Sequence, residues 1–356
     1  MNATEKLRQA IISQTNIHTL ALTGTTAAVA TSSLTPVTQK YIDQLVSGSN
    51  IALGGILSVA LLASSLVSIA GGFLADKYGR KIILILGIAL CSIGAITYFK
   101  TETVIELLSA VLLSTVGTSI ILSTMTAMTA ESVTDKRRAS AFGYVETLRA
   151  VGSVLGPMVG GWIMIAYGIR SPFLFAFTMY LLVLIGVFLF LKETHKGEQH
   201  TRIFAWKLSE TKQIHHSLPD SRSLYMLVVA QIIISFGGAI GGSLFVSYAY
   251  KVVLAQPLDV SIITSLSTAI SIIVMIPSAA ICDRIGRIPP LLAHEILVVA
   301  AQFGYALAQT PTHLILVSAL GGVGAIGIPG FRALQTELMP QQHRVKLLSL
   351  YSFIAS

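Results

Sequence analysis

Two residues of opposite charge, Glu146 and Arg149, stand inside an otherwise apolar segment that runs from 141 to 167. Residues three apart share one flank of a helix, so the carboxylate and the guanidinium are spaced to form an ion pair. A charge near the centre of a membrane-spanning helix costs at least a few kcal/mol and is rarely accidental. The pair is either a mutually neutralised brace for the helix, or a site for a substrate or a proton whose pairing changes during function.

Two further polar residues in apolar segments are candidates for the same site. Gln231 lies in the segment 223–250, where a polar side chain suits a water-facing wall, and Arg332 lies five residues before Glu337, near the end of its segment. Arg332 is interpreted as a gating or snorkelling group, with substrate binding as the alternative. The sequence has no Ser-His, paired-Asp, His-Glu-x-x-His or phosphate-loop pattern. We therefore predict no catalytic residue, no metal site and no cofactor, and an enzyme is disfavoured.

The elements that hold these residues are long apolar segments. Of the 356 residues, 53% are hydrophobic and only 11% are charged, and the mean hydropathy is +0.76. Soluble domains carry about 25% charged residues. Runs long enough to cross a bilayer lie near 17–38, 51–75, 82–99, 104–130, 141–167, 171–191, 223–250, 259–281, 288–308 and 312–338, and another begins near Val345. The sequence predicts an all-α polytopic membrane protein with about 10 to 11 transmembrane helices.

Lysine and arginine residues are distributed unevenly between the alternate loops. Eighteen of the 24 fall on the side of the N-terminus and the central polar segment, and two lie inside apolar segments. The other side has only Lys40, Lys100, Arg170 and Lys251. Because positive loops stay in the cytoplasm, we expect a multi-pass protein of the cell (plasma) membrane with a cytoplasmic N-terminus. Topology and anionic lipid account for the net charge of +8, and we expect no nucleic acid partner.

The two halves of the chain carry the same pattern at a constant distance. Asp76 and Arg80 follow the second apolar segment, and Asp283 and Arg287 follow the eighth, 207 residues later in each case. The polar segment between the halves contains four histidines with irregular spacing, which is typical of a plain linker. We predict two pseudo-symmetric six-helix bundles, 1–195 and 223–356, joined by a cytoplasmic loop, 196–222. The second bundle is expected to be truncated in its helix 11, as a fragment or as a natural short form.

At the first of these turns the sequence resembles the major facilitator superfamily. The family signature Gly-x-x-x-Asp-x-x-Gly-Arg-Lys is met by Gly72, Asp76, Gly79, Arg80 and Lys81. A tight turn between two helices favours glycine at the position of Gly79, because glycine accepts a positive φ. The resemblance implies that Asp76 and Arg80 lock the two halves together on the cytoplasmic side, with Arg80 paired to Glu131. The alternative, favoured for Lys81, is that these charges only mark topology. The remaining residues assigned to this gating set are Arg138, Asp283, Gly286 and Arg287.

A second signature of the same family lies in the segment that holds the charged pair. It consists of Gly143, Gly152, Gly156, Pro157, Gly160 and Gly161. The pattern resembles that of exporters, notably proton-driven drug antiporters. Glycines four residues apart leave a smooth stripe on which another helix packs closely, so helix packing alone is the alternative. Leu113 stands where proton-coupled members often have an arginine, and the first apolar segment has no Asp or Glu. Both absences weigh against proton antiport, which needs a titratable group.

The residues and the resemblance together predict a secondary active transporter that moves small organic solutes by alternating access. Export driven by an ion gradient, with a proton as the expected ion, is the favoured direction. One alternative is an importer or symporter of a small, possibly anionic metabolite bound by Arg149, and another is a receptor that transports nothing. The expected partners are a small-molecule substrate, the coupling ion and membrane lipid, and the chain is expected to act as a monomer.

Overall fold

The computed structural model describes residues 3–46, 50–134, 137–194, 221–331 and 334, and within this part the chain forms helices without a strand. The helices are α1 Ala3–Ser33, α2 Thr35–Leu45, α3 Asn50–Tyr78, α4 Arg80–Lys100, α5 Val104–Glu131, α6 Arg138–Tyr167, α7 Ser171–Phe190, α9 Ser221–Lys251, α10 Pro257–Ile285, α11 Ile288–Leu307, α12 Pro311–Val323 and the 3-10 turn η2 Gly324–Gly327. Nine of the ten complete apolar segments predicted from the sequence fall on one or more of these helices, and the tenth, 312–338, does so in its part up to residue 331. The all-α class is confirmed.

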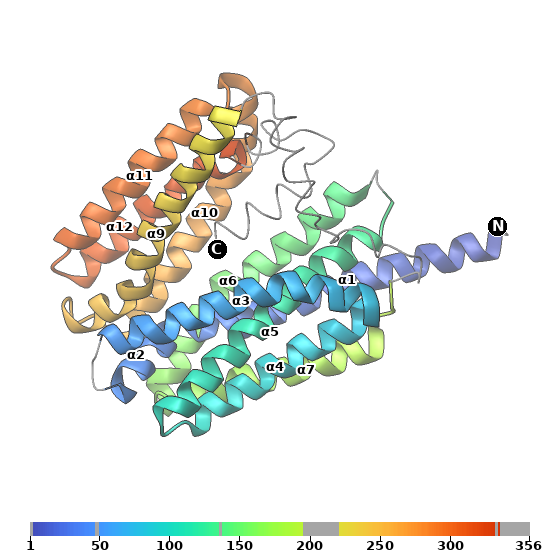
Figure 1. Cartoon of the computed structure of the whole chain (residues 1–356), viewed down its shortest axis with the longest axis horizontal. Helices are drawn as coiled ribbons and strands as arrows, with labels where there is room; N and C mark the ends of the chain where they lie inside the picture. The colour runs from blue at the N-terminus through green and yellow to red at the C-terminus, as the bar shows by residue number, and fades with distance from the viewer. Residues whose placement is uncertain (1–2, 47–49, 135–136, 195–220, 332–333, 335–356) are drawn as a thin grey trace. The chain divides into compact units, whose positions relative to one another are not determined.

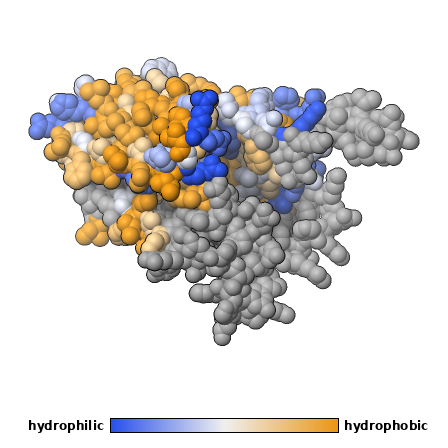
Figure 2. Space-filling view, turned by 90° about the horizontal axis from the view of Figure 1, so that it is seen from above, coloured by the Kyte–Doolittle hydropathy of each residue, from blue (hydrophilic) through white to orange (hydrophobic). Residues whose placement is uncertain are grey.

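Much of the surface that these helices present is apolar. In the described part of the chain, seven helices are long and apolar enough to cross a membrane, namely α4, α5, α6, α7, α10, α11 and α12 with its continuation to Phe331. Large side chains such as Phe188, Ile276 and Phe303 are 67%, 75% and 68% exposed. Figure 2 shows hydrophobic residues spread widely over the described surface in that view. Such a surface suits lipid rather than water, and the polytopic membrane fold is confirmed.

The chain divides into two compact units. The first comprises Met1–Lys196 and Val246–Thr268, and the second comprises Gly197–Phe245 and Ala269–Ser356. In the first unit α1 packs along α6 and α7, and α4 packs along α5 and α7 (Figure 1). Its core contains the fully buried Phe173, whose ring stacks on Tyr98 at a centroid distance of 4.9 Å. In the second unit α11 packs against α12 and η2. The boundaries of the two six-helix bundles stay a prediction.

The apolar segment predicted at 17–38 is divided between two helices. α1 ends at Ser33 and α2 begins at Thr35, with Pro36 in its first turn. Proline has no amide hydrogen to donate to the carbonyl four residues earlier, which favours a helix start at this point. The sequence predicted a single span over 17–38. The structure instead ends one helix at Ser33 and begins a second, short helix at Thr35.

The repeated turns have the backbone that the motif predicts. Gly79, between α3 and α4, has φ +99°, and Gly286, between α10 and α11, has φ +89°. Residues other than glycine rarely adopt a positive φ of this size. The positive φ expected at Gly79 is confirmed, and the second copy of the motif builds the same kind of turn.

Candidate functional site

Glu146 and Arg149 form the ion pair that their spacing allows. Glu146 Oε2 accepts hydrogen bonds from Arg149 Nε at 2.8 Å and Nη2 at 2.7 Å. The Arg149 side chain is 37% exposed and the Glu146 side chain is 51% exposed. Both residues stand in the first half of α6, and Arg149 is about 16 Å along the helix from Arg138 at 1.5 Å per residue. Each charge of the pair therefore has a partner, and both side chains remain accessible from the space beside α6.

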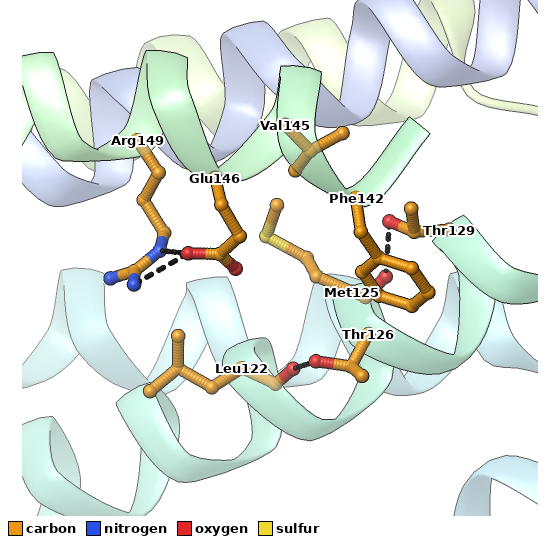
Figure 3. A pocket seen from close by; sticks show the side chains of 8 residues that line it. All are labelled: Leu122, Met125, Thr126, Thr129, Phe142, Val145, Glu146 and Arg149. Atoms are coloured by element: carbon orange, nitrogen blue, oxygen red, sulfur yellow. Dashed lines mark hydrogen bonds and ion pairs between the residues drawn. The ribbon is translucent and has the colours of Figure 1, made fainter. Parts of the chain in front are cut away.

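A small pocket lies between this pair and α5. Figure 3 shows the two charged side chains extending from α6 toward α5, with the Met125 side chain beside Glu146. The remaining lining residues are Leu122, Thr126 and Thr129 on α5, and Phe142 and Val145 on α6. The Thr126 and Thr129 hydroxyls donate to carbonyls of their own helix. The pocket thus combines an apolar wall with one ion pair, and its volume of about 10 Å³ holds about one water molecule.

α1 closes another side of the site. A Cβ added at Gly24 would lie 2.9 Å from Met125 Cε and 3.8 Å from Arg149 Cβ, so the α1 backbone comes close to both. Nearby along the same two helices, His18 Nδ1 lies 3.1 Å from the Tyr144 hydroxyl, and the two rings meet edge to face. The sequence interpretation did not select His18 or Tyr144. The signal was present, because a histidine in the first apolar segment is a titratable group where no carboxylate occurs.

Three glycines of the signature line the seam where α6 packs against α1. A Cβ at Gly152 would collide with the Thr25 carbonyl, one at Gly156 would collide with the Ser32 hydroxyl, and one at Gly160 would collide with the Ser33 carbonyl. The α1 carbonyls that these positions face, those of Thr25, Val29 and Ser33, also recur every four residues, so the two helices run parallel in a constant register. This close packing fixes the rotation of α6 about its axis, and it thereby fixes where Glu146 and Arg149 point.

Two glycines of the signature lie outside this seam. Gly161 packs instead against Ser261 of α10, and a Cβ at Gly143 would meet nothing within 4 Å. Pro157 is buried inside α6, which continues through it. Only Gly152, Gly156 and Gly160 therefore form the packing stripe against α1, and the other residues of the signature have different neighbours.

The first turn motif lies in a cluster of hydrogen bonds. Arg80 Nη2 is 2.9 Å from Glu131 Oε1, which is the pair that the family resemblance implied. The Glu193 carboxylate accepts hydrogen bonds from the backbone amides of Arg80 and Lys81, both at 3.0 Å. Thr194 Oγ1 donates to Glu131 Oε2 at 2.8 Å. The cluster joins the start of α4, the end of α5 and the segment after α7.

Lys81 has a defined contact of its own in this cluster. Its Nζ donates to the Phe188 carbonyl at 2.9 Å, in the last turn of α7. A cation at a helix C-terminus donates hydrogen bonds to carbonyls that have no partner in the helix, and it interacts favourably with the negative end of the helix dipole. The contact gives Lys81 a packing partner in addition to the topological role expected for it.

Other residues selected from the sequence are described only partly. The positions of Gly72, Asp76, Arg138 and Gln231 fall within α3, α6 and α9, but their side chains lie outside the described part of the structure, and Arg332 lies outside the described residues altogether. In the second turn motif, Arg287 Nη1 is 3.1 Å from Asp283 Oδ1, one helical turn away. Among the described residues, no group of three His, Cys, Asp or Glu side chains is placed to hold a metal ion.

Solved structures with similar folds are transporters. A variant of the nucleoside transporter NupG superposes with a TM-score of 0.80 at 10% identity, covering 95% of this chain and 87% of that one. A D-xylose-proton symporter superposes with a TM-score of 0.71 at 17% identity, covering 97% and 87%. At these identities the likeness shows the fold alone.

Curated relatives are more similar in sequence. Multidrug resistance protein 2 of Bacillus subtilis is 27% identical over 65% of this chain and 57% of its own length. The multi-drug resistance efflux pump PmrA of Streptococcus pneumoniae is 27% identical over 81% and 71%. The quinolone resistance protein NorA of Staphylococcus aureus is 26% identical over 64% and 56%. The chain thus matches little more than half the length of two of these relatives.

The family itself is recognised over most of the chain. A model described as Major Facilitator Superfamily matches residues 20–356, which include the turn motif, the glycine signature and the charged pair. This family consists of transporters rather than enzymes. The chain belongs to the Major Facilitator Superfamily.

Proposed function

We propose that this chain exports small amphipathic organic compounds by alternating access and exchanges them for protons. The observation that carries the proposal is the Glu146–Arg149 pair, which lies well inside α6 and borders an apolar pocket. Its two charges are 51% and 37% exposed, so neither is sealed in the protein core. A charged group kept at such depth in a membrane helix marks a substrate or ion pathway.

The lining of the pocket suits a compound with an apolar body and a charged end. Leu122, Met125 and Phe142 offer apolar contact, and methionine adapts to ligands of different shape. A cationic group competes with Arg149 for the Glu146 carboxylate, and an anionic group competes with Glu146 for Arg149. Because the pocket has room for about one water in this structure, binding requires side chains or helices to move apart. Such a change is what alternating access provides.

Proton coupling requires a group that gains and loses a proton as access changes. Glu146 is one candidate, because its carboxylate lines the pocket and its ion pair with Arg149 is partly exposed. His18 is a second candidate, because it is an ionisable side chain in the first apolar segment. Its contact with Tyr144 connects it to the helix that carries the charged pair. These two groups are proposed as the ionisable side chains for coupling, because the first apolar segment, 17–38, has no Asp or Glu.

The remaining assignments support transport as a whole. In the proposal, Asp76, Arg80 and their repeat Asp283 and Arg287 act as gates at the turns, and Gln231 and Arg332 contribute to the cavity or to its edge. The chain acts as a monomer in the cell membrane, with the N-terminus and the loop 196–222 in the cytoplasm. The uneven distribution of lysine and arginine supports this orientation.

The test is transport by the purified chain in liposomes. The probe is ethidium, a fluorescent amphipathic cation with a permanent charge, and the membrane potential is clamped so that only the pH gradient drives movement. Wild-type protein is expected to accumulate the dye in the acidic compartment. Glu146→Gln and Arg149→Ala are each expected to slow this by about tenfold, which corresponds to about 1.4 kcal/mol. Glu102→Gln, which removes an exposed carboxylate elsewhere, is the matched control.

The same assay separates the alternatives. If both substitutions leave dye movement unchanged, the pair is removed from the mechanism. If the dye does not move but a radiolabelled carboxylate exchanges across the membrane and Arg149→Ala abolishes that exchange, the import of an anionic metabolite replaces export. If neither solute moves in protein that remains folded by thermal melting, the chain is a receptor rather than a transporter.

A further inference from the structure

The chain leaves α7 in a way that gives the residues after it defined contacts. α7 ends at Phe190, and Leu191 follows with an extended backbone, φ −78° and ψ 131°. If the helix continued, the backbone amide of Lys192 would donate to the carbonyl of Phe188, four residues earlier. In the structure both of these groups have other partners. Those partners decide where the chain after Lys192 goes.

The backbone of Lys192 is held by the side chain of Asn16, which belongs to α1. The Lys192 amide donates to Asn16 Oδ1 at 3.0 Å, and Asn16 Nδ2 donates to the Lys192 carbonyl at 3.2 Å. Asn16 is only 2% exposed, and Leu191, which precedes Lys192, is 1% exposed. A carboxamide has a donor nitrogen and an acceptor oxygen, so it satisfies both backbone groups of one residue. A side chain that lacks either group would leave a backbone group here without a partner.

The other half of the missing helical hydrogen bond is taken by Lys81. Its Nζ donates to the Phe188 carbonyl at 2.9 Å. Asn16 and Lys81 therefore occupy the two groups that would have joined to extend α7. Asparagine is unfavourable inside a helix because its side chain competes for backbone groups. Here the side chain of Asn16 binds the backbone at the end of another helix, 176 residues away.

This exit from α7 brings two side chains to the first turn motif. The Glu193 carboxylate accepts from the backbone amides of Arg80 and Lys81, both at 3.0 Å. Thr194 Oγ1 donates to Glu131 Oε2 at 2.8 Å, and Glu131 Oε1 lies 2.9 Å from Arg80 Nη2. If α7 were longer, Glu193 and Thr194 would follow a helical path instead of an extended one. Neither side chain would then keep its present direction.

We propose that Asn16 is a positioning residue for the gate formed by Arg80 and Glu131. By ending α7 where it does, Asn16 sets the direction of Glu193 and Thr194, which contact the two members of that pair. The inference rests on the gating role given to Arg80 in the proposed function. It adds α1 to the elements that determine this cluster, which are otherwise α4, α5 and the segment after α7.

The first test is a double-mutant cycle in the purified full chain, followed by thermal melting. Asn16→Leu removes both hydrogen bonds at similar side-chain volume, and Glu193→Ala removes the acceptor at the start of α4. If Asn16 acts through Glu193, the loss of melting temperature caused by Glu193→Ala is expected to fall by about half or more in the Asn16→Leu background.

Thr19→Ala is the matched control for this cycle. Thr19 lies three residues after Asn16 on α1, is half-buried, and donates its hydroxyl hydrogen to the Thr15 carbonyl of its own helix. Its substitution therefore removes a polar group from the same helix without changing the end of α7. The effects of Thr19→Ala and Glu193→Ala on the melting temperature are expected to add.

A second variant, Asn16→Asp, separates the hydrogen-bond pattern from side-chain packing. A charged carboxylate has acceptors but no donor, so it places an oxygen against the Lys192 carbonyl. A protonated carboxyl has one donor and one acceptor and reproduces the pattern of the amide. Compared with wild type at the same pH, the melting temperature of Asn16→Asp is therefore expected to recover as the pH is lowered. That of Asn16→Leu is expected to show no such recovery.

The link to the gate is measured as ethidium transport in liposomes. Asn16→Leu is expected to lower the maximal rate by several-fold and to leave the ethidium concentration for half-maximal rate unchanged, because Asn16 does not line the pocket. Thr19→Ala is expected to transport at the wild-type rate.

Three outcomes overturn the proposal. Two of them remove the positioning role, namely additive losses from Asn16→Leu and Glu193→Ala in folded protein, and an Asn16→Asp variant that responds to pH no more than Asn16→Leu. The third is full transport by folded Asn16→Leu protein, which would remove the link to the gate. If wild-type protein moves no dye, the proposed export function fails, and the melting experiments still decide whether Asn16 positions Glu193.

Discussion

The two copies of the turn motif have the same sequence pattern and different surroundings. A Cβ at Gly79 would lie 2.8 Å from Glu193 Oε2, whereas a Cβ at Gly286 would meet nothing within 4 Å. Arg80 pairs with Glu131 on another helix, and Arg287 pairs with Asp283 one turn away on α10. The motif itself therefore determines the backbone conformation of the turn, because its glycine has a positive φ in both copies. The carboxylates that connect the first turn to other parts of the unit, Glu131 and Glu193, lie outside the motif.

Glu193 contacts the first turn and accounts for much of the difference in surroundings between the two turns. Its carboxylate accepts from two backbone amides at the first turn of α4, where helix amides have no partner within the helix. The negative charge also favours the positive end of the helix dipole. We infer that Glu193 holds the first turn as a rigid joint.

The largest effect is expected at the two glycines. Gly79→Ala places a side chain at φ +99° and displaces Glu193, whereas Gly286→Ala has only the backbone cost. Strain of this kind costs about 1 to 3 kcal/mol, and loss of a cap adds about 1 kcal/mol. Thermal melting of the purified chain is expected to show a larger loss for Gly79→Ala. Equal losses for the two substitutions would remove the proposed contribution of Glu193.

A smaller effect is expected when Glu193 itself is changed. Glu193→Ala removes the acceptor for the amides of Arg80 and Lys81, and replacement of a helix cap by alanine costs about 0.5 to 2 kcal/mol. Glu193→Gln keeps an oxygen acceptor but loses the charge, so it is expected to recover part of the stability. Melting curves of both variants measure this order. Identical curves for Glu193→Ala and wild type would show that the cap contributes nothing.

The smallest effect is expected at the paired arginines. Arg80 uses both Nε and Nη2 toward Glu131, at 3.2 Å and 2.9 Å, which lysine cannot reproduce. Arg80→Lys is expected to cost about 1 kcal/mol, and Arg287→Lys only a few tenths, because the Asp283 side chain is 75% exposed. High salt is expected to reduce the effect of Arg287→Lys further. A larger loss for Arg287→Lys than for Arg80→Lys would reverse the comparison.

The fold could be predicted from the sequence because lipid imposes a simple pattern. Within the described residues, the apolar segments long enough to cross a bilayer are helical, and the positive φ of Gly79 followed from a turn that few other residues permit. The break at Leu34 was missed because the length of an apolar segment gives no information on a helix that starts inside it. Pro36 favours such a start. The 3-10 turn at Gly324–Gly327 was missed for a similar reason.

The site could be predicted only where partners are close in sequence. Glu146 and Arg149 follow from helical periodicity, since three residues separate them. Contacts that depend on tertiary packing could not be derived in this way. The His18–Tyr144 contact and the Lys251–Asp43 pair join residues more than 100 positions apart, and their spacing carries no periodic signal. Close helix packing on the glycine stripe was predicted, but the choice of α1 as its partner required the structure.

The central claim is that the chain couples an outward flow of amphipathic solute to an inward flow of protons. The most direct test is to invert the pH gradient across the same liposomes while the membrane potential is clamped, and to follow ethidium on both sides. The dye is expected to collect in whichever compartment is acidic and to reverse when the gradient is reversed. Dye movement that is independent of the gradient, or equal to that in protein-free liposomes, would contradict the account.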